Sequence, residues 1–357
     1  MRIFKSILSF IVLSIAVTLC SCHIDMTNSS NDDSGNGEET PAQSSYKAGD
    51  IALAKIKIGD IEYENTAQVY VTGPRGAQIT GADPSFVENT ADDFYKGVFR
   101  TGRKVNLSPY IMSKYEVTQE LYETVMNGNS QNINKTPSYH TFSPPEGEIQ
   151  GYRPVERVTW YDAVYFCNEL TKKTFGESEQ VYTITDITVD TDYYFISSAT
   201  VTIDITKKGY RLPTEAEWEF AARGGDITKL AWNYLFSGHD TETGKIYADY
   251  ENEGMNDVGW YLYNSDGKTH QVGKKTANSL GIFDMCGNVW EWCYDCYESI
   301  TTGEIINPVG SMLNLDRISR GGCWGAQPYA CSVCYRVYNK PLVRYYSYGF
   351  RVVRSAQ

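Results

Sequence analysis

The 357-residue chain has only four histidines and comparatively little positive charge. Lysine and arginine number 32 against 44 aspartate and glutamate residues, so the net charge is −12. Because no basic stripe is available to neutralise phosphates, we expect no nucleic-acid partner. The three histidines of the main body, His140, His239 and His270, lack the H-x-x-x-H spacing of a metal-binding helix, which argues against a histidine-rich iron site.

After the N-terminus, the sequence lacks any apolar run long enough to cross a bilayer. At the N-terminus itself, Arg2 and Lys5 precede an uncharged apolar run over residues 7–19. That run is shorter than the ~20 residues that a spanning helix needs. A basic start followed by a short apolar core is typical of a secretory signal peptide, so we expect residues 1–21 to be removed on export.

The predicted signal ends in Leu-Cys-Ser-Cys at residues 19–22, which resembles a bacterial lipobox with Cys22 as the cysteine that receives the lipid. An ordinary signal peptide that ends near cysteines is the alternative. Residues 22–47 are polar and of low complexity, and they predict a flexible tether because they cannot offset the entropy cost of ordering. We therefore expect a lipid-anchored protein of the cell envelope, on the periplasm-facing side or the cell surface, with one domain over residues 48–357.

The composition of this domain favours an α+β fold with few short helices and short antiparallel sheets. The chain has 28 tyrosines, 7 tryptophans and 30 glycines, which indicates many turns and aromatic packing. Helices are expected from Thr118 to about residue 127, over about residues 160–170, and after a capping box at residues 214–217. Alternating Thr, Ile, Val and Tyr over residues 181–206 predict a β-hairpin.

Five segments carry a family resemblance. They are K-Y-E-V-T-Q at 114–119, R-P-V-E-R-V-T-W at 153–160, G-Y-R-L-P-T-E-A-E-W-E-F-A-A-R-G-G at 209–225, G-I-F-D-M-C-G-N-V-W-E-W at 281–292, and R-G-G-C-W at 320–324 with G-F-R-V-V at 349–353.

In this order and spacing, the segments resemble the formylglycine-generating-enzyme, or sulfatase-modifying-factor, family over roughly residues 65–357. The resemblance implies a variant of the C-type-lectin fold with little regular secondary structure. Some motif residues are expected to be structural. Arg211 and Glu217 are predicted to form a buried ion pair, and Trp218, Trp290 and Trp292 to lie in the core.

The resemblance also implies calcium. Enzymes of the family bind Ca²⁺ at the G-N-V-W-E segment, where loops supply the oxygens that a hard cation needs. Carried over by position, the ligands are the Glu291 side chain and the carbonyls of Cys286, Gly287 and Val289. A second site maps to Asp249, Tyr250, Asn264 and Asp266. For both sites, the alternative is an acidic loop that hydrogen-bonds its own backbone.

The implied activity is oxidation of a sulfatase cysteine to formylglycine, with O₂ and copper(I) held by two thiolates, which are soft ligands suited to Cu(I). Aligned on Gly321 and Gly322, the second family cysteine is Cys331. The first position holds Ala326, which has no ligand atom, and Cys323 replaces the serine that follows the two glycines. The usual copper pair therefore cannot form.

We accordingly expect a non-catalytic binding or scaffold module for an unknown glycan or protein. The alternative is a formylglycine-generating enzyme in which Cys323 or Cys334 substitutes for the missing thiol beside Cys331. A third possibility, another oxygen-dependent oxidation at a histidine-rich iron site, is disfavoured because the histidines are so few.

Seven cysteines remain after Cys20 and Cys22, so at least one thiol is unpaired within the chain. Cys293 with Cys296, and Cys331 with Cys334, form two C-x-x-C pairs. In an oxidising compartment, we expect local disulfides at both pairs rather than one four-cysteine zinc site. Cys167 is expected to be a buried free thiol on the apolar face of a helix.

Overall fold

The computed structural model describes residues 52–53, 55–72, 78–81, 93–239, 252–310 and 315–356. The predicted signal peptide, Cys22 and the tether lie outside these residues, as do Asp249 and Tyr250. Across the described ranges, no helix is long and apolar enough to span a membrane.

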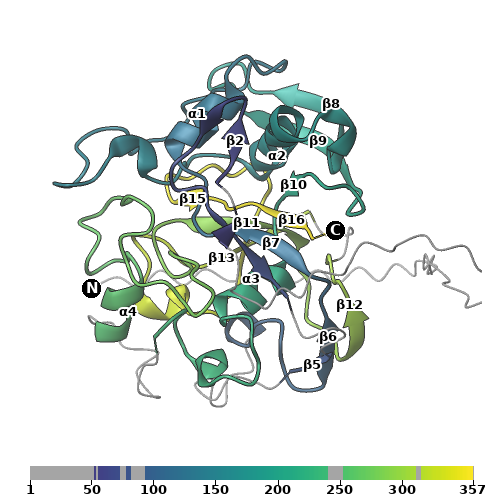
Figure 1. Cartoon of the computed structure of the whole chain (residues 1–357), viewed down its shortest axis with the longest axis vertical. Coiled ribbons are helices and arrows are strands. Elements are labelled where there is room, and N and C mark those ends of the chain that lie inside the picture. The colour runs from purple at the N-terminus through teal and green to yellow at the C-terminus, as the bar shows by residue number, and fades with distance from the viewer. Residues whose placement is uncertain are drawn as a thin grey trace, which may run out of the picture. The chain divides into compact units, whose positions relative to one another are not determined.

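The two largest sheets are built from very short strands (Figure 1). The first is antiparallel and has the order β1-β4-β7-β16-β10, so the last strand lies between one strand from the first third of the chain and one from its middle. Its strands are β1 (Ala52–Leu53), β4 (Gln68–Val71), β7 (Tyr110–Ser113), β10 (Tyr210–Arg211) and β16 (Val353–Ser355). The second, of order β14-β13-β11-β15, contains β11 (Trp290–Cys296), β13 (Arg317–Arg320), β14 (Val337–Asn339) and β15 (Tyr348–Gly349).

Three smaller sheets complete the strand content of the described residues, and β2 with β3 form one of them. The expected hairpin is confirmed as β8 and β9, and β12-β6-β5 form a three-stranded sheet. Two pairings are parallel rather than antiparallel as expected, namely β12 with β6 and β11 with β15. The strands are β2 (Lys57–Ile58), β3 (Ile61–Glu62), β5 (Gln78–Thr80), β6 (Arg103–Asn106), β8 (Tyr182–Val189), β9 (Ile196–Ile203) and β12 (Gly303–Ile306).

The three predicted helices are confirmed, and each begins at a threonine that accepts a backbone N–H. Thr118 caps α1 (Gln119–Met126), while Thr159 and Thr214 form capping boxes at α2 (Trp160–Thr174) and α3 (Glu215–Ala222). A short helix α4 (Glu253–Val258) was not expected. The 3₁₀ turns are η1 (Asp93–Tyr95), η2 (Gln150–Tyr152), η3 (Glu177–Glu179), η4 (Leu230–Asn233) and η5 (Pro328–Cys331).

Buried tryptophans organise the core, as the sequence predicts. Trp218 of α3 belongs to one apolar cluster, while Trp290 and Trp292 of β11 belong to a second cluster that packs against α1 and α2. Trp218 and Trp292 are fully buried, and Trp292 donates its indole N–H to the carbonyl of Val158 at 3.1 Å. These rings hold segments of irregular backbone at fixed positions.

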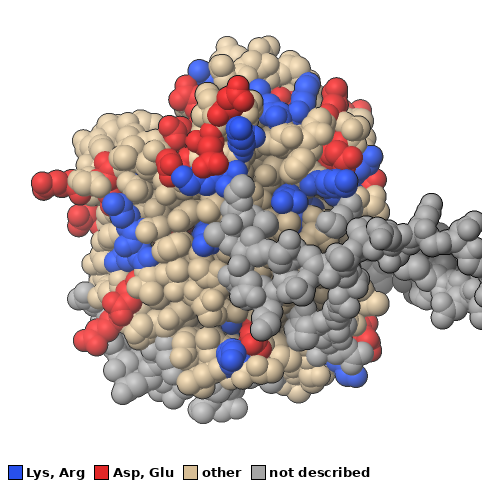
Figure 2. All heavy atoms as spheres, viewed as in Figure 1, with Lys and Arg blue, Asp and Glu red and all other residues tan. Residues whose placement is uncertain are grey.

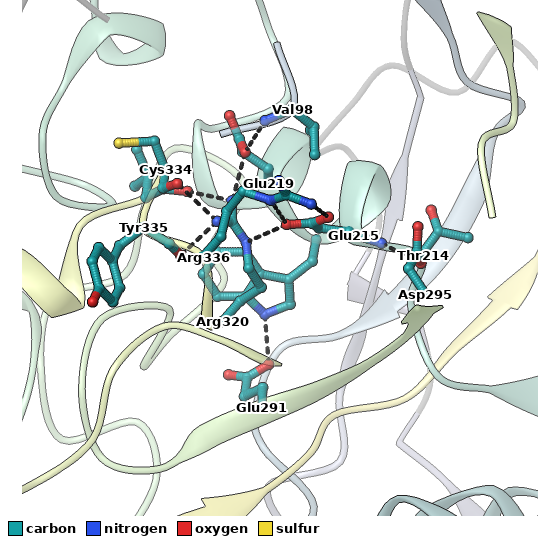
Figure 3. A network of polar contacts seen from close by, with 12 residues as sticks. Val98, Thr214, Glu215, Glu219, Glu291, Asp295, Arg320, Cys334, Tyr335 and Arg336 are labelled. Atoms are coloured by element: carbon teal, nitrogen blue, oxygen red, sulfur yellow. Dashed lines mark hydrogen bonds and ion pairs between the residues drawn. The ribbon is translucent and has the colours of Figure 1, made fainter. Parts of the chain in front are cut away.

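Buried arginine–glutamate pairs fasten loops and strands to α3. The predicted Arg211–Glu217 pair is confirmed as a bidentate contact of 2.6 and 2.7 Å. Figure 3 shows two further pairs on α3, in which Arg336 contacts Glu215 at 2.6 Å and Arg320 contacts Glu219 at 2.5 Å. At the surface, by contrast, lysines and arginines lie among aspartates and glutamates on the face drawn in Figure 2.

Candidate functional site

The turn after β13 places the residues that correspond to the family's catalytic segment. Gly321 and Gly322 have φ of +92° and +77°, and a Cβ on Gly322 would lie 2.4 Å from the Cys331 sulfur. Glycine is therefore required at position 322 both for its conformation and for its lack of a side chain. The turn is fixed to the G-N-V-W-E segment because Gly287 donates its N–H to the Gly321 carbonyl, at 2.7 Å.

The thiols beneath this turn are buried and protonated. Cys331 ends η5 and is fully buried, and burial raises the pKa of its thiol well above the ordinary value. Burial also raises the pKa of Cys323 to about 11. The two thiols are near enough to interact electrostatically, yet Ala326 supplies no sulfur. Since the family's copper site needs two soft thiolate ligands and Ala326 supplies none, these residues do not fit that site.

The predicted disulfides are wrong, because all seven cysteines of the described residues are free. Cys293 packs in the core cluster around Trp218, whereas Cys296 faces a separate cavity. The Cys334 sulfur lies 3.7 Å from the Ser332 hydroxyl oxygen. Cys331 lies near two other thiols, Cys286 and Cys323, which together with burial raise its pKa. Sequence spacing alone does not bring these sulfurs together.

Two other cysteine predictions have clear outcomes. No three His, Cys, Asp or Glu side chains within the described ranges converge to hold a metal ion, so the four-cysteine zinc alternative is not supported. Cys167 is confirmed as a buried free thiol on α2, and burial raises its pKa.

Glu291, the predicted calcium ligand, has a protein cation as its partner. Its two carboxylate oxygens accept hydrogen bonds from Arg351 at 2.6 and 2.7 Å, and one of them also accepts the Trp218 indole N–H at 2.8 Å. Glu291 and Arg351 are both completely buried. Arg351 thus already neutralises the carboxylate, and calcium would have to compete with this ion pair. Calcium binding through the Glu291 side chain stays a prediction.

Two more buried carboxylates lie beside this pair. Burial raises the pKa of Asp284 to about 6, and burial together with the charge of Asp284 raises the pKa of Glu116 well above its usual range. Asp284 accepts the Gly273 N–H through Oδ2 at 2.7 Å, whereas its buried Oδ1 has no hydrogen-bond partner among the described residues. Three buried carboxyl groups therefore lie around Arg351, and Lys275 adds a second positive charge near Asp284.

The second predicted calcium segment is only partly described. Asp249 and Tyr250 lie outside the described residues. The Asn264 side chain closes a local turn, since it accepts the Tyr261 N–H at 2.9 Å and donates to the Gly259 carbonyl at 2.9 Å. Asp266 is exposed. Calcium binding at this segment stays a prediction.

The sequence analysis missed a group of rings beside the catalytic segment, which we call the aromatic surface: Tyr139, His140, Trp324 and Tyr346. Trp324 and Tyr346 stack with centroids 5.7 Å apart, and Tyr139 lies 5.5 Å from Tyr346. His140 meets Trp324 edge-on at 5.3 Å, and burial lowers its pKa to about 4, so that its ring is neutral. Tyr139 and Tyr346 remain 51 % and 48 % exposed.

The aromatic surface comes from three distant segments, so no local pattern identified it. A partial signal was the run Tyr345-Tyr346-Ser347-Tyr348. The indole N–H of Trp324 donates to the Tyr346 carbonyl at 3.2 Å, which fixes the two rings relative to each other. Half-exposed, mutually packed aromatic rings are typical of binding surfaces.

These motifs on an irregular α+β frame define the class of sulfatase-modifying-factor-like domains. The family model described as "Sulfatase-modifying factor enzyme 1-like domain" matches residues 59–356, and the chain belongs to this family. The predicted family and fold are thereby confirmed.

Three relatives illustrate the range of the family. Chaperone protein LppX of Paenibacillus barcinonensis is 35% identical over 253 residues, which covers 67% of this chain and 80% of that protein. The formylglycine-generating enzyme of Mycobacterium tuberculosis is 42% identical over 91 residues, but these cover only 24% of this chain and 26% of the enzyme. Treponema denticola variable protein 1 has a solved structure with a TM-score of 0.64 and 32% identity, covering 84% of this chain and 98% of that one.

Proposed function

We propose that this protein is an exported, lipid-anchored binding module that holds another protein at the aromatic surface and does not oxidise it. The observation that carries the proposal is the state of the catalytic segment. Ala326 stands in place of one copper-ligand cysteine, and Cys331 is fully buried with a protonated thiol. A substrate thiol would have no exposed sulfur pair to meet.

The aromatic surface supports a binding role. Tyrosine and tryptophan supply large contact areas at low entropic cost and often anchor protein–protein interfaces. Here Trp324 lies two residues after Gly322, beside the catalytic segment, and its indole N–H is held by the Tyr346 carbonyl. Similarity to a protein called a chaperone favours a protein partner over a glycan.

We also infer that calcium binds beside the G-N-V-W-E segment, with Asp284 rather than Glu291 as the carboxylate ligand. The orphaned Oδ1 of Asp284, which lies near the buried carboxyl groups of Glu116 and Glu291, favours a cation there. Because no three acidic, histidine or cysteine side chains converge in the described part of the chain, most ligands would be carbonyl oxygens, those of Cys286, Gly287 and Val289. Bound calcium would stabilise the loop that supports Trp290.

The alternative function is a formylglycine-generating enzyme that uses Cys323 with Cys331. The electrostatic proximity of these two thiols is the observation in its favour. It requires both buried thiols to become exposed and deprotonated, at a cost that their raised pKa values reflect.

The binding proposal can be tested with an unfolded polypeptide as the probe. Reduced and carboxamidomethylated ribonuclease A offers a basic chain to this acidic protein, and its binding to the full chain can be followed by fluorescence anisotropy at physiological salt. Removal of an aromatic anchor typically costs ~2 kcal/mol or more. We therefore expect Trp324→Ala and Tyr346→Ala each to weaken binding at least roughly tenfold.

Phe175→Ala is the matched control, since this ring is 41 % exposed at the end of α2 and packs against Tyr210 and Arg354 instead of the aromatic surface. It should leave binding unchanged. Equal affinity for all variants, or no binding by the folded wild type, would contradict the proposal. Binding to a glycan array that disappears in the same two variants would instead assign a glycan partner.

A further inference from the structure

A second candidate site lies away from the aromatic surface, in a cavity of about 240 Å³. It is lined by β6, the start of α3, the end of β11 and the segment that leads from β11 through β12. Among its lining residues are Arg103, Glu215, Asp295 and Arg336. The volume is several times the ~30 Å³ that one water molecule occupies in the liquid, so the cavity can hold a small ligand.

Arg103 is the most unusual side chain in this wall. It is only 6 % exposed, and its Nε and Nη1 atoms are buried with no hydrogen-bond partner among the described residues. No ion pair to Arg103 is formed within the same residues, and burial lowers the pKa of its guanidinium. A buried cation without a partner is costly, and proteins normally pair it or bind an anion to it.

The neighbouring glutamates attract Arg103 at longer range, but their direct contacts are made to three other arginines. Glu219 contacts Arg320 at 2.5 Å and Arg223 at 2.9 Å. Glu215 holds Arg336 through two contacts of 2.6 and 2.8 Å, as Figure 3 shows. Even so, Arg336 leaves its Nη1 buried and without a partner.

Two further acids line the cavity, of which Glu298 is exposed to solvent and Asp295 contributes little negative charge. Its Oδ2 accepts the backbone N–H of Glu215 at 2.8 Å (Figure 3), and burial raises its pKa to about 8. At neutral pH it is therefore mostly protonated. Arg103 and Arg336 thus face one buried ionised carboxylate in this wall, that of Glu215.

The first turn of α3 adds to this positive potential. Glu215 and Ala216 begin the eight-residue helix and line the cavity, so the positive end of the helix dipole faces it. Helix N-termini favour bound anions, and planar guanidinium groups match the geometry of phosphate and carboxylate oxygens.

We propose that this cavity is a binding site for a small oxyanion, with the free N–H groups of Arg103 and Arg336 as donors. The ligand is a phosphate, a sulfate or a carboxylate group, which would supply the acceptor that both arginines lack. This site is separate from the proposed binding of a protein at the aromatic surface, and either proposal can fail without the other.

Isothermal titration calorimetry on the full chain tests the proposal. Sodium phosphate, sulfate and acetate are titrated separately, against sodium chloride of matched ionic strength. We expect saturable binding of at least one of the three, with stoichiometry near one. Phosphate or sulfate binding without acetate binding would assign a tetrahedral anion, and the reverse would assign a carboxylate.

Two variants separate this site from general salt effects. Arg103→Met removes the buried cation and should weaken binding at least tenfold. Lys104→Met removes a positive charge from the adjacent exposed position of β6 and should leave the affinity unchanged. Phosphate and sulfate also stabilise proteins in general, because these ions are excluded from the protein surface. That effect would be the same in the wild type, Arg103→Met and Lys104→Met.

Arg103→Met is expected to fold, because it removes an unpaired buried charge. If it does not fold, Arg103→Lys provides the second test, since it keeps the charge but loses the forked geometry and should also bind more weakly. Absence of saturable binding by the folded wild type with all three anions would overturn the proposal. Equal affinity of wild type and the Arg103 variant would overturn it as well.

Discussion

Replacement of Glu291 by glutamine should destabilise the fold strongly, because it leaves Arg351 as a buried cation. The carboxylate holds Arg351 through two contacts of 2.6 and 2.7 Å, and both residues are completely buried. Breaking such a pair from one side costs roughly 3–5 kcal/mol. Glutamine can still accept the Trp218 indole N–H, and Glu116 and Asp284 can take over part of the charge. We therefore expect a loss at the low end, about 3 kcal/mol.

Urea unfolding in buffer with EDTA measures this loss without interference from calcium. The control is Glu123→Gln, which removes an exposed carboxylate 3.0 Å from Lys135 and should cost below about 1 kcal/mol. The double variant Glu291→Gln/Arg351→Met removes both charges and should be more stable than Glu291→Gln alone. A loss below about 1 kcal/mol for Glu291→Gln, or a double variant at least as unstable as the single one, would refute the reasoning.

Three further predictions concern pH, calcium and the glycine turn. The raised pKa of Asp295 means that the folded state keeps a proton that the unfolded state releases, so the free energy of unfolding should fall as pH rises from about 4 to about 8. Urea titrations of Asp295→Asn should show a smaller fall in this free energy over the same range. Calcium should raise the melting temperature of the wild type in a way that EDTA reverses, whereas Asp284→Ala should show no such shift. Gly322→Ala should lower the free energy of unfolding, measured in urea, by roughly 2–4 kcal/mol, because the backbone has φ of +77° and the new Cβ would lie 2.4 Å from the Cys331 sulfur. Adding Cys331→Ala should recover part of this loss.

The sequence predicted those parts of the fold that depend on neighbouring residues. Capping at Thr214 needs only the residues of one helical turn, and the Arg211–Glu217 pair spans six positions. The parallel pairing of β6 with β12 joins residues two hundred positions apart, as in Arg103 with Gly303, and nothing local encodes it. Helix α4 is only six residues long and carries too little periodicity to be recognised.

The same distinction explains the results for the candidate site. Positional similarity identified Glu291, but it could not reveal that Arg351, sixty residues later, supplies its counter-charge. The C-x-x-C spacing suggested disulfides that the structure does not contain. The prediction failed because spacing carries no information on side-chain direction. The aromatic surface depends on the meeting of Tyr139, Trp324 and Tyr346, which only the folded chain brings together.

The central claim, that this member of the family binds a partner without oxidising it, is tested most directly by an assay for aldehyde. The full chain is reduced, loaded with copper(I) and incubated in air with a peptide that carries the Cys-x-Pro-x-Arg motif, and the product is analysed by mass spectrometry. With Ala326 in place of a ligand cysteine, we predict that no aldehyde forms. Aldehyde that appears with the wild type and disappears with Cys331→Ser would contradict the account, and would show that a second thiol such as Cys323 completes the copper site.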